Sequence, residues 1–96
     1  MGFVQIVEFT TDNIDKMREI GSKYEAESGL PGNTAALYKD RDKENTYVVI
    51  GSFPSYEKAM ENSERPETQA LAEEMGKLAT GPASYRNLEE IQSWGG

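Results

Sequence analysis

The sequence contains no cysteine and no histidine. Their absence excludes disulfide bonds, thiolate and imidazole metal ligands, cysteine nucleophiles and every catalytic triad that needs an imidazole base. We therefore expect no metal site. A general base working near neutral pH would have to be a desolvated Glu or Asp, because histidine, the usual base at that pH, is absent.

Positive charge is scarce: 10 Lys and Arg face 17 Asp and Glu, for a net charge of −7. Such a chain repels phosphate backbones, and no basic stripe offsets the repulsion. Arg41 and Lys43 alternate with acidic residues, which is typical of a solvated hairpin tip. Nucleic-acid binding is not expected.

Long apolar runs are also missing. No segment approaches the roughly 20 residues of a membrane span. The opening residues 1–6 lack the basic region of a signal peptide, and Ile6 stands where a myristoylation motif requires Ser or Thr. We expect a cytoplasmic protein without membrane contact, and the 96 residues predict a single domain over 1–96.

Four segments have the composition of strands. Residues 3–10 and 46–53 are rich in β-branched and aromatic side chains, and 33–39 and 83–88 alternate more weakly. The charged turn 40–45 predicts a hairpin between the second and third strands.

After the first and third predicted strands, apolar residues recur at helical spacing, so we expect helices there. Thr11 or Asp12 is expected to cap the first helix, which ends at Gly29. Ser55 is expected to cap a second helix over 56–62, and Pro66 either breaks that helix or begins another. The apolar positions of the helices are Ile14, Met17, Ile20 or Gly21, and Tyr24 in the first, and Leu71, Met75, Leu78 and Ala79 after Pro66.

The order β-α-β-β-α-β predicts an α+β, ferredoxin-like fold, in which both helices cover one face of a four-stranded antiparallel sheet. The uncovered face of such a sheet is normally polar. Here the first and third strands are apolar on both faces, which would leave a large patch exposed. A second copy of the chain is the simplest partner that could cover this patch. We therefore expect a homodimer with two facing sheets, a dimeric α+β barrel. Ile91 and Trp94 in the tail are expected either to pack across this interface or to belong to a disordered terminus.

Three segments carry a family resemblance: FVQIVEF at 3–9, YVVIGSFPS at 47–55 and the stretch 55–66. Together they resemble the small dimeric α+β barrel proteins related to the antibiotic biosynthesis monooxygenases. The resemblance implies a pocket between sheet and helices in each subunit. It also implies cofactor-free oxygenation of electron-rich aromatic substrates, or haem degradation in members that bind haem through a histidine. Because this chain has no histidine, the haem role is excluded and no cofactor is expected.

Three positions depart from the family. Phe53 stands where its oxygenases often have Trp, Val49 where they carry Asn, and Asn62 where many members have His. Three functions therefore stay open. The first is a cofactor-independent monooxygenase, or a related enzyme, acting on an aromatic or polyketide-like substrate. The second is a non-catalytic ligand-binding or structural dimer. The third is a protein-interaction scaffold, which would leave an apolar patch exposed even in the dimer.

The candidate catalytic residues are Arg86, Asn62 and Glu8. Arg86 would stabilise an anionic ligand or a developing enolate, and its alternative role is an ion pair. Asn62 lies near the helix break, where it either lines the pocket or ends the helix. Glu8, on an otherwise apolar strand, is the candidate desolvated base or a residue of the dimer interior.

The expected ligand is a small apolar or aromatic molecule. The alternatives to the pocket residues are packing in the core for the apolar strand residues, edge placement for the tyrosines and solvation for the arginine. The candidate pocket residues are Tyr24, Tyr38, Val49, Phe53, Arg65 and Tyr85.

Overall fold

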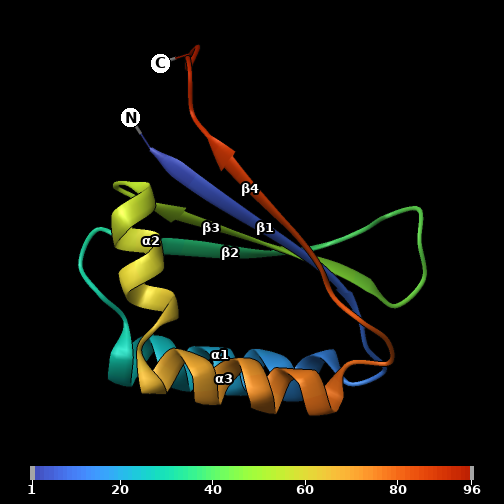
Figure 1. Ribbon diagram of the computed structural model, residues 1–96. Helices are drawn as coiled ribbons and strands as arrows, with labels where there is room; N and C mark the ends of the chain where they lie inside the picture. Colours follow the sequence, from blue (N-terminus) through green and yellow to red (C-terminus); the bar gives the residue numbers. More distant parts are fainter. Residues whose placement is uncertain (1, 96) are drawn as a thin grey trace.

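The chain alternates strands with helices (Figure 1), and a computed structural model describes its residues 2–95. The elements are β1 (Phe3–Thr10), α1 (Ile14–Ser28), β2 (Thr34–Lys39), β3 (Thr46–Phe53), α2 (Tyr56–Ser63), α3 (Pro66–Leu78) and β4 (Ser84–Glu89). The four strands form one antiparallel sheet in the order β2-β3-β1-β4. This confirms the predicted α+β, ferredoxin-like fold.

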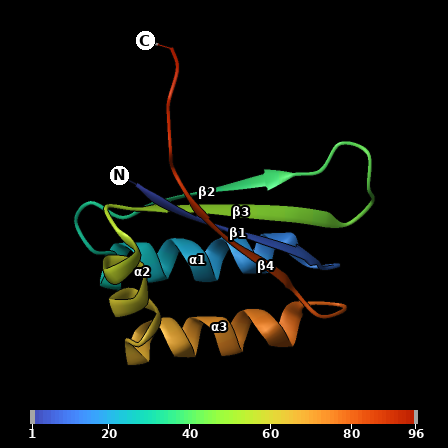
Figure 2. The same cartoon turned by 45° about the horizontal axis from the view of Figure 1, so that its top comes forward.

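All three helices lie on one side of the sheet (Figures 1 and 2). The aromatic ring of Phe3 identifies the row of strand side chains on that side. It meets the ring of Tyr56 on α2 edge-on, with centroids 5.4 Å apart, and is only 3% exposed. Because strand side chains alternate, every second residue of β1 and its paired neighbours share this side.

The register therefore divides the sheet into two named faces. The helix-side face consists of Phe3, Gln5, Val7, Phe9, Ala35, Leu37, Lys39, Tyr47, Val49, Gly51, Phe53, Tyr85, Asn87 and Glu89. The open face has an apolar centre and polar ends, and consists of Val4, Ile6, Glu8, Thr10, Thr34, Ala36, Tyr38, Thr46, Val48, Ile50, Ser52, Ser84, Arg86 and Leu88. No helix of the described residues covers the open face (Figures 1 and 2), and the central residues Ile6 and Ile50 are only half-buried.

The buried core is small for a chain of this length. Among the described residues, the buried apolar side chains are Phe3, Met17 and Ala59. The chain exposes 6979 Å², whereas a folded monomer of 10.7 kDa exposes about 5,500 Å². The single chain thus exposes about 1,500 Å² more surface to solvent than is expected for a monomer of its mass.

The cap of α1 differs from the sequence prediction. Asn13, not Thr11 or Asp12, accepts the capping hydrogen bond, from the backbone N–H of Lys16. The Thr11 hydroxyl donates instead to the Leu78 carbonyl oxygen over 2.7 Å, and the residue is 1% exposed. The prediction was wrong because Thr11 joins the end of β1 to the end of α3, a contact between segments far apart in sequence.

The region after β3 agrees with the prediction. The Ser55 side chain caps α2 by accepting from the Lys58 N–H, and the helix stops before Pro66, which begins α3. The residue before a proline is pushed toward extended backbone, and Arg65 has φ −67° and ψ 138°. Of the two alternatives for Pro66, the second is confirmed, because Pro66 begins a separate helix, α3, after α2 has ended. None of the helices in residues 2–95 combines the length and hydropathy needed to cross a membrane.

Replacement of Phe3 tests the assignment of the core. Phe3→Ala removes a buried aromatic ring and should lower the free energy of unfolding by about 3–5 kcal/mol, measured by urea denaturation at fixed protein concentration. Leu37→Ala, on the exposed strand β2, is the control and should change it by about 0.5 kcal/mol or less. Equal losses in the two variants would contradict the assignment.

Candidate functional site

A cluster of polar side chains joins the three helices where α2 meets α3. We call it the junction cluster, and its members are Tyr24, Ser28, Asn62, Arg65 and Thr68. The phenol oxygen of Tyr24 lies 2.8 Å from the Thr68 hydroxyl oxygen and donates to Asn62 Oδ1 over 3.4 Å. Tyr24 thereby connects α1 to both of the other helices.

Arg65 holds the helix break against the end of α1. Its Nη1 donates to the Ser28 carbonyl oxygen over 2.7 Å and to Asn62 Oδ1 over 3.4 Å. Its Nη2 lies 2.8 Å from a carboxylate oxygen of Glu67, and the side chain is 20% exposed. A cation suits this place because the last carbonyls of a helix lack intrahelical donors. Arg65 is therefore a bridge between helices and not a solvated side chain.

The orientation of the Asn62 amide follows from these bonds. Its oxygen accepts from two donors, Tyr24 and Arg65, so its NH₂ group points elsewhere. Within residues 2–95 that NH₂ group has no hydrogen-bond partner, and it is not sealed from solvent. It is thus a free donor whose direction is set by its neighbours. Such a donor can bind a carbonyl oxygen or stabilise an oxyanion.

Three candidate pocket residues, Val49, Phe53 and Tyr85, lie on the helix-side face. Val49 and Phe53 are half-buried, and Tyr85 on the edge strand β4 is 63% exposed. The Phe53 ring lies 6.4 Å from that of Phe3. This face combines aromatic and aliphatic surface that the helices do not seal, as a site for an apolar ligand requires.

The helix-side face also carries one stacked aromatic pair and one pair of hydrogen-bonded amides. The rings of Phe9 and Tyr47 stack with centroids 6.0 Å apart. Between the apolar rows, the Gln5 amide N–H donates to Asn87 Oδ1 over 3.2 Å. Few polar groups on an apolar surface are typical of sites that orient a small molecule.

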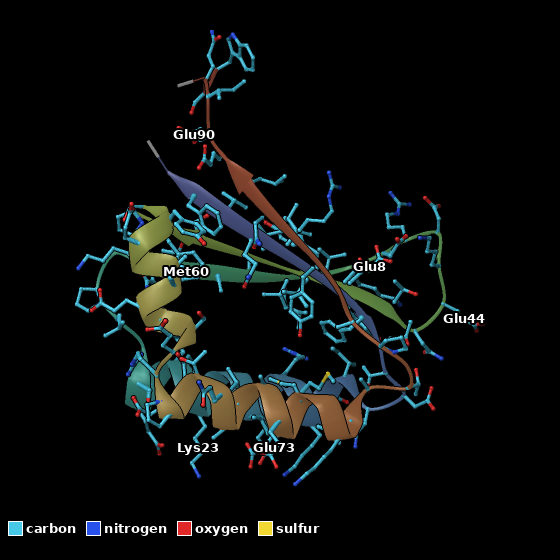
Figure 3. The ribbon with its side chains drawn as sticks, in the orientation of Figure 1. Glu8, Lys23, Glu44, Met60, Glu73 and Glu90 are labelled. Atoms are coloured by element: carbon cyan, nitrogen blue, oxygen red, sulfur yellow. The ribbon has the colours of Figure 1, made fainter. Side chains whose placement is uncertain are left out.

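The other three candidates, Glu8, Tyr38 and Arg86, lie on the open face, away from the helices. A Glu8 carboxylate oxygen is 3.9 Å from the Lys43 ammonium, and Figure 3 shows Glu8 toward the end of the sheet that carries the β2–β3 hairpin with Glu44. Arg86 forms no ion pair with any residue from 2 to 95. The structure thus brings Tyr24, Asn62 and Arg65 together and separates them from Glu8, Tyr38 and Arg86.

Thr68 and Ser28 were not among the sequence candidates. A signal for Thr68 was available, because the apolar spacing Leu71, Met75, Leu78 continues backward by three residues to Thr68. Ser28 contributes only its carbonyl oxygen, which no side-chain pattern reveals.

Hollows on the surface of residues 2–95 include a groove between two helices and a smaller hollow beside the tail, and neither is the pocket expected between sheet and helices. A groove of about 420 Å³ runs between α1 and α3 and is lined by Ile20, Tyr24 and Leu71 with charged residues around them. Figure 3 shows Lys23, on its rim, pointing away from the sheet. A second hollow of about 300 Å³ lies between Tyr56 and Ile91. Val49, Phe53 and Tyr85 line neither of them.

The charged side chains do not form a metal centre. Among residues 2–95, no group of three or more Asp or Glu side chains is placed to hold a metal ion.

The fold is shared with oxygenases of known structure. SnoaB, a cofactor-independent oxygenase from Streptomyces nogalater, matches with a TM-score of 0.79 and 19% sequence identity over 96% of this chain and 95% of that chain. An antibiotic biosynthesis monooxygenase matches with a TM-score of 0.75 and 13% identity over 96% of this chain and all of the other.

A third structure, Rv0793 from Mycobacterium tuberculosis, matches with a TM-score of 0.78 and 18% identity over 97% of this chain and 98% of that chain. By sequence, no family model and no curated protein matches the chain. At these identities the likeness establishes the fold, which is the fold of the antibiotic biosynthesis monooxygenases over nearly the whole chain.

The bridging role of Arg65 can be tested by Arg65→Gln. The variant loses the guanidinium that binds Ser28 and Asn62, so the free energy of unfolding in urea should fall by about 1.5–3 kcal/mol. Arg18→Gln is the control, because Arg18 is solvent-exposed and its ion pair with Asp15 should contribute about 0.5 kcal/mol or less. An Arg65→Gln protein as stable as the control would contradict the bridge.

Proposed function

We propose that this protein is a dimeric α+β barrel of the antibiotic biosynthesis monooxygenase type, acting as a cofactor-independent monooxygenase on a small aromatic or polyketide-like substrate. The observation that carries the proposal is the fold shared with SnoaB along nearly the full length of both chains. We also propose that the protein is located in the cytoplasm, as expected from the sequence.

The proposed site lies between the helix-side face and the helices. Val49, Phe53 and Tyr85 supply the surface against which a flat substrate packs, and Tyr24 and Arg65 orient the amide of Asn62. The Asn62 NH₂ group binds the substrate oxygen and stabilises the anion that forms when the substrate loses a proton. Such catalysis depends on positioning and hydrogen bonding, which this chain can supply without cysteine or histidine.

The reaction balances with dioxygen as the only oxidant. The electron-rich anion of a phenolic methylene compound reacts with O₂, and the CH₂ group is oxidised to a carbonyl group. One oxygen atom of O₂ enters the new carbonyl group. The other leaves as water with the two hydrogens of the methylene. Four electrons pass from the substrate to dioxygen, so neither a cofactor nor an external reductant is required.

The dimer in this proposal covers the open face. About 1,500 Å² of excess surface exceeds the roughly 800 Å² that each partner buries in a standard interface. Val4, Ile6, Val48 and Ile50 form the apolar centre of that face. Because Glu8, Tyr38 and Arg86 share it, we propose that they lie between the two sheets and not in the substrate site.

A second candidate function is a non-catalytic ligand-binding module. One observation favours it: Glu8, the acid considered as a base, lies on the face opposite Asn62 and the helices. Under this alternative the helix-side face binds the same class of molecule and releases it unchanged.

Ile50→Lys tests the dimer. A lysine at the centre of the open face would face its symmetry mate's sheet, and we expect sedimentation at micromolar concentration to show monomers where the unmodified chain forms dimers. Glu73→Lys makes the same kind of change on the outer surface of α3, where Glu73 points away from the sheet (Figure 3), and should leave dimers intact. A folded, monomeric unmodified chain would overturn the proposed dimer.

Asn62→Ala tests the activity. Anthrone- and quinol-type substrates are incubated under oxygen, and product formation and oxygen uptake are followed. Loss of the oriented donor should lower kcat by about 10²–10³. Gln69→Ala, on the exposed side of α3, is the control and should retain full activity. Binding without turnover by the unmodified chain would support the ligand-binding module in place of the enzyme.

A further inference from the structure

The chain ends in a tail with large apolar side chains that its own fold does not cover. The tail follows β4, and its last ladder bond is donated by the Glu90 N–H to the Gly2 carbonyl oxygen over 2.9 Å. Beyond it, Ile91 and Trp94 are 86% and 82% exposed, more than any other large apolar side chain in residues 2–95. Figure 3 shows Glu90 where the tail leaves the sheet.

The tail has no strand of its own subunit left to pair with. Its neighbour in the sheet is β1, which begins at Phe3, so the residues after Glu90 run past the end of the sheet. Figures 1 and 2 both show the tail running away from α1 and α3. Ile91, where the tail begins, borders a hollow with Tyr56 of α2 but stays exposed. The tail beyond Ile91 runs away from the helices.

This direction identifies the molecule that can cover the tail. A second copy placed on the open face lies on the side of the sheet away from α1 and α3, toward which the end of the tail, with Trp94, runs. A buried tryptophan removes about 150–250 Å² from water, and tryptophan is enriched at the energetic centres of protein interfaces. In a two-fold dimer both tails make the same contact, so each contribution counts twice.

We propose that the tail of each subunit packs on the partner subunit in the dimer, with Ile91 and Trp94 as its anchors. This inference rests on the dimer of the proposed function. The receiving surface is the rim of the partner's open face, where the partner's Tyr38 on one edge strand and the partner's Leu88 on the other are exposed apolar side chains. The tail clasps the partner and adds apolar contact outside the sheet-to-sheet interface.

Trp94 reports on its own burial because it is the single tryptophan of the chain. Tryptophan emission and acrylamide quenching are measured over a dilution series, and sedimentation gives the oligomeric state of the same samples. We expect blue-shifted, shielded emission in the dimer, which changes to the emission of exposed tryptophan as dimers dissociate. Dimers in which acrylamide quenches Trp94 as readily as free tryptophan would overturn the tail contact and leave the dimer standing.

Trp94→Ser gives an independent measurement. It should raise the dimer dissociation constant by roughly 30-fold or more, whereas the control Gln92→Ser, two residues away in the same tail, should change it by less than about threefold. Both positions are exposed in the single chain, and circular dichroism should show unchanged secondary structure. Equal dissociation constants for the two variants would overturn the tail contact. Monomers of the unmodified chain at every concentration would instead refute the dimer itself, and with it the inference.

Discussion

The organisation of this protein follows from one constraint: a sheet that is apolar on both faces has helices for only one of them. β1 and β3 place Ile6 and Ile50 on one face and Val7 and Val49 on the other. The crossovers between strands turn the same way, so every helix arrives on the same side. This mismatch contributes to the large exposed area of the single chain, together with Tyr85 on the helix-side face and the side chains of the tail.

The same alternation decides which candidate residues can act together. A shift of one position along a strand moves a side chain through the sheet, so neighbours such as Tyr85 and Arg86 belong to different environments. The sequence shows that the faces alternate but does not show which of them meets the helices. The contact between Phe3 and Tyr56 settles that question, because it joins a strand to a helix across the interior.

Local signals made much of the fold predictable. The strand at 46–53, the Ser55 cap and the break before Pro66 depend on residues within one or two turns of each other, and all three agree with the structure. Features that depend on distant segments could not be predicted in this way. The Thr11 hydroxyl donates to the carbonyl oxygen of Leu78, 67 residues away, and does not cap α1. The junction cluster likewise requires α1 to lie beside α3.

The sheet separates the proposed dimer interface on its open face from the proposed substrate site on its helix-side face. Ile6 and Val7 are consecutive residues, yet the first faces the proposed partner and the second faces the helices. Covering the open face would hold the central strands in place, and those strands carry Val49 and Phe53. Among the helices, Tyr24 and Arg65 direct the Asn62 NH₂ group by binding the oxygen of the same amide. In the proposed function, an apolar strand surface and an oriented amide position the substrate, and neither role requires imidazole or thiol.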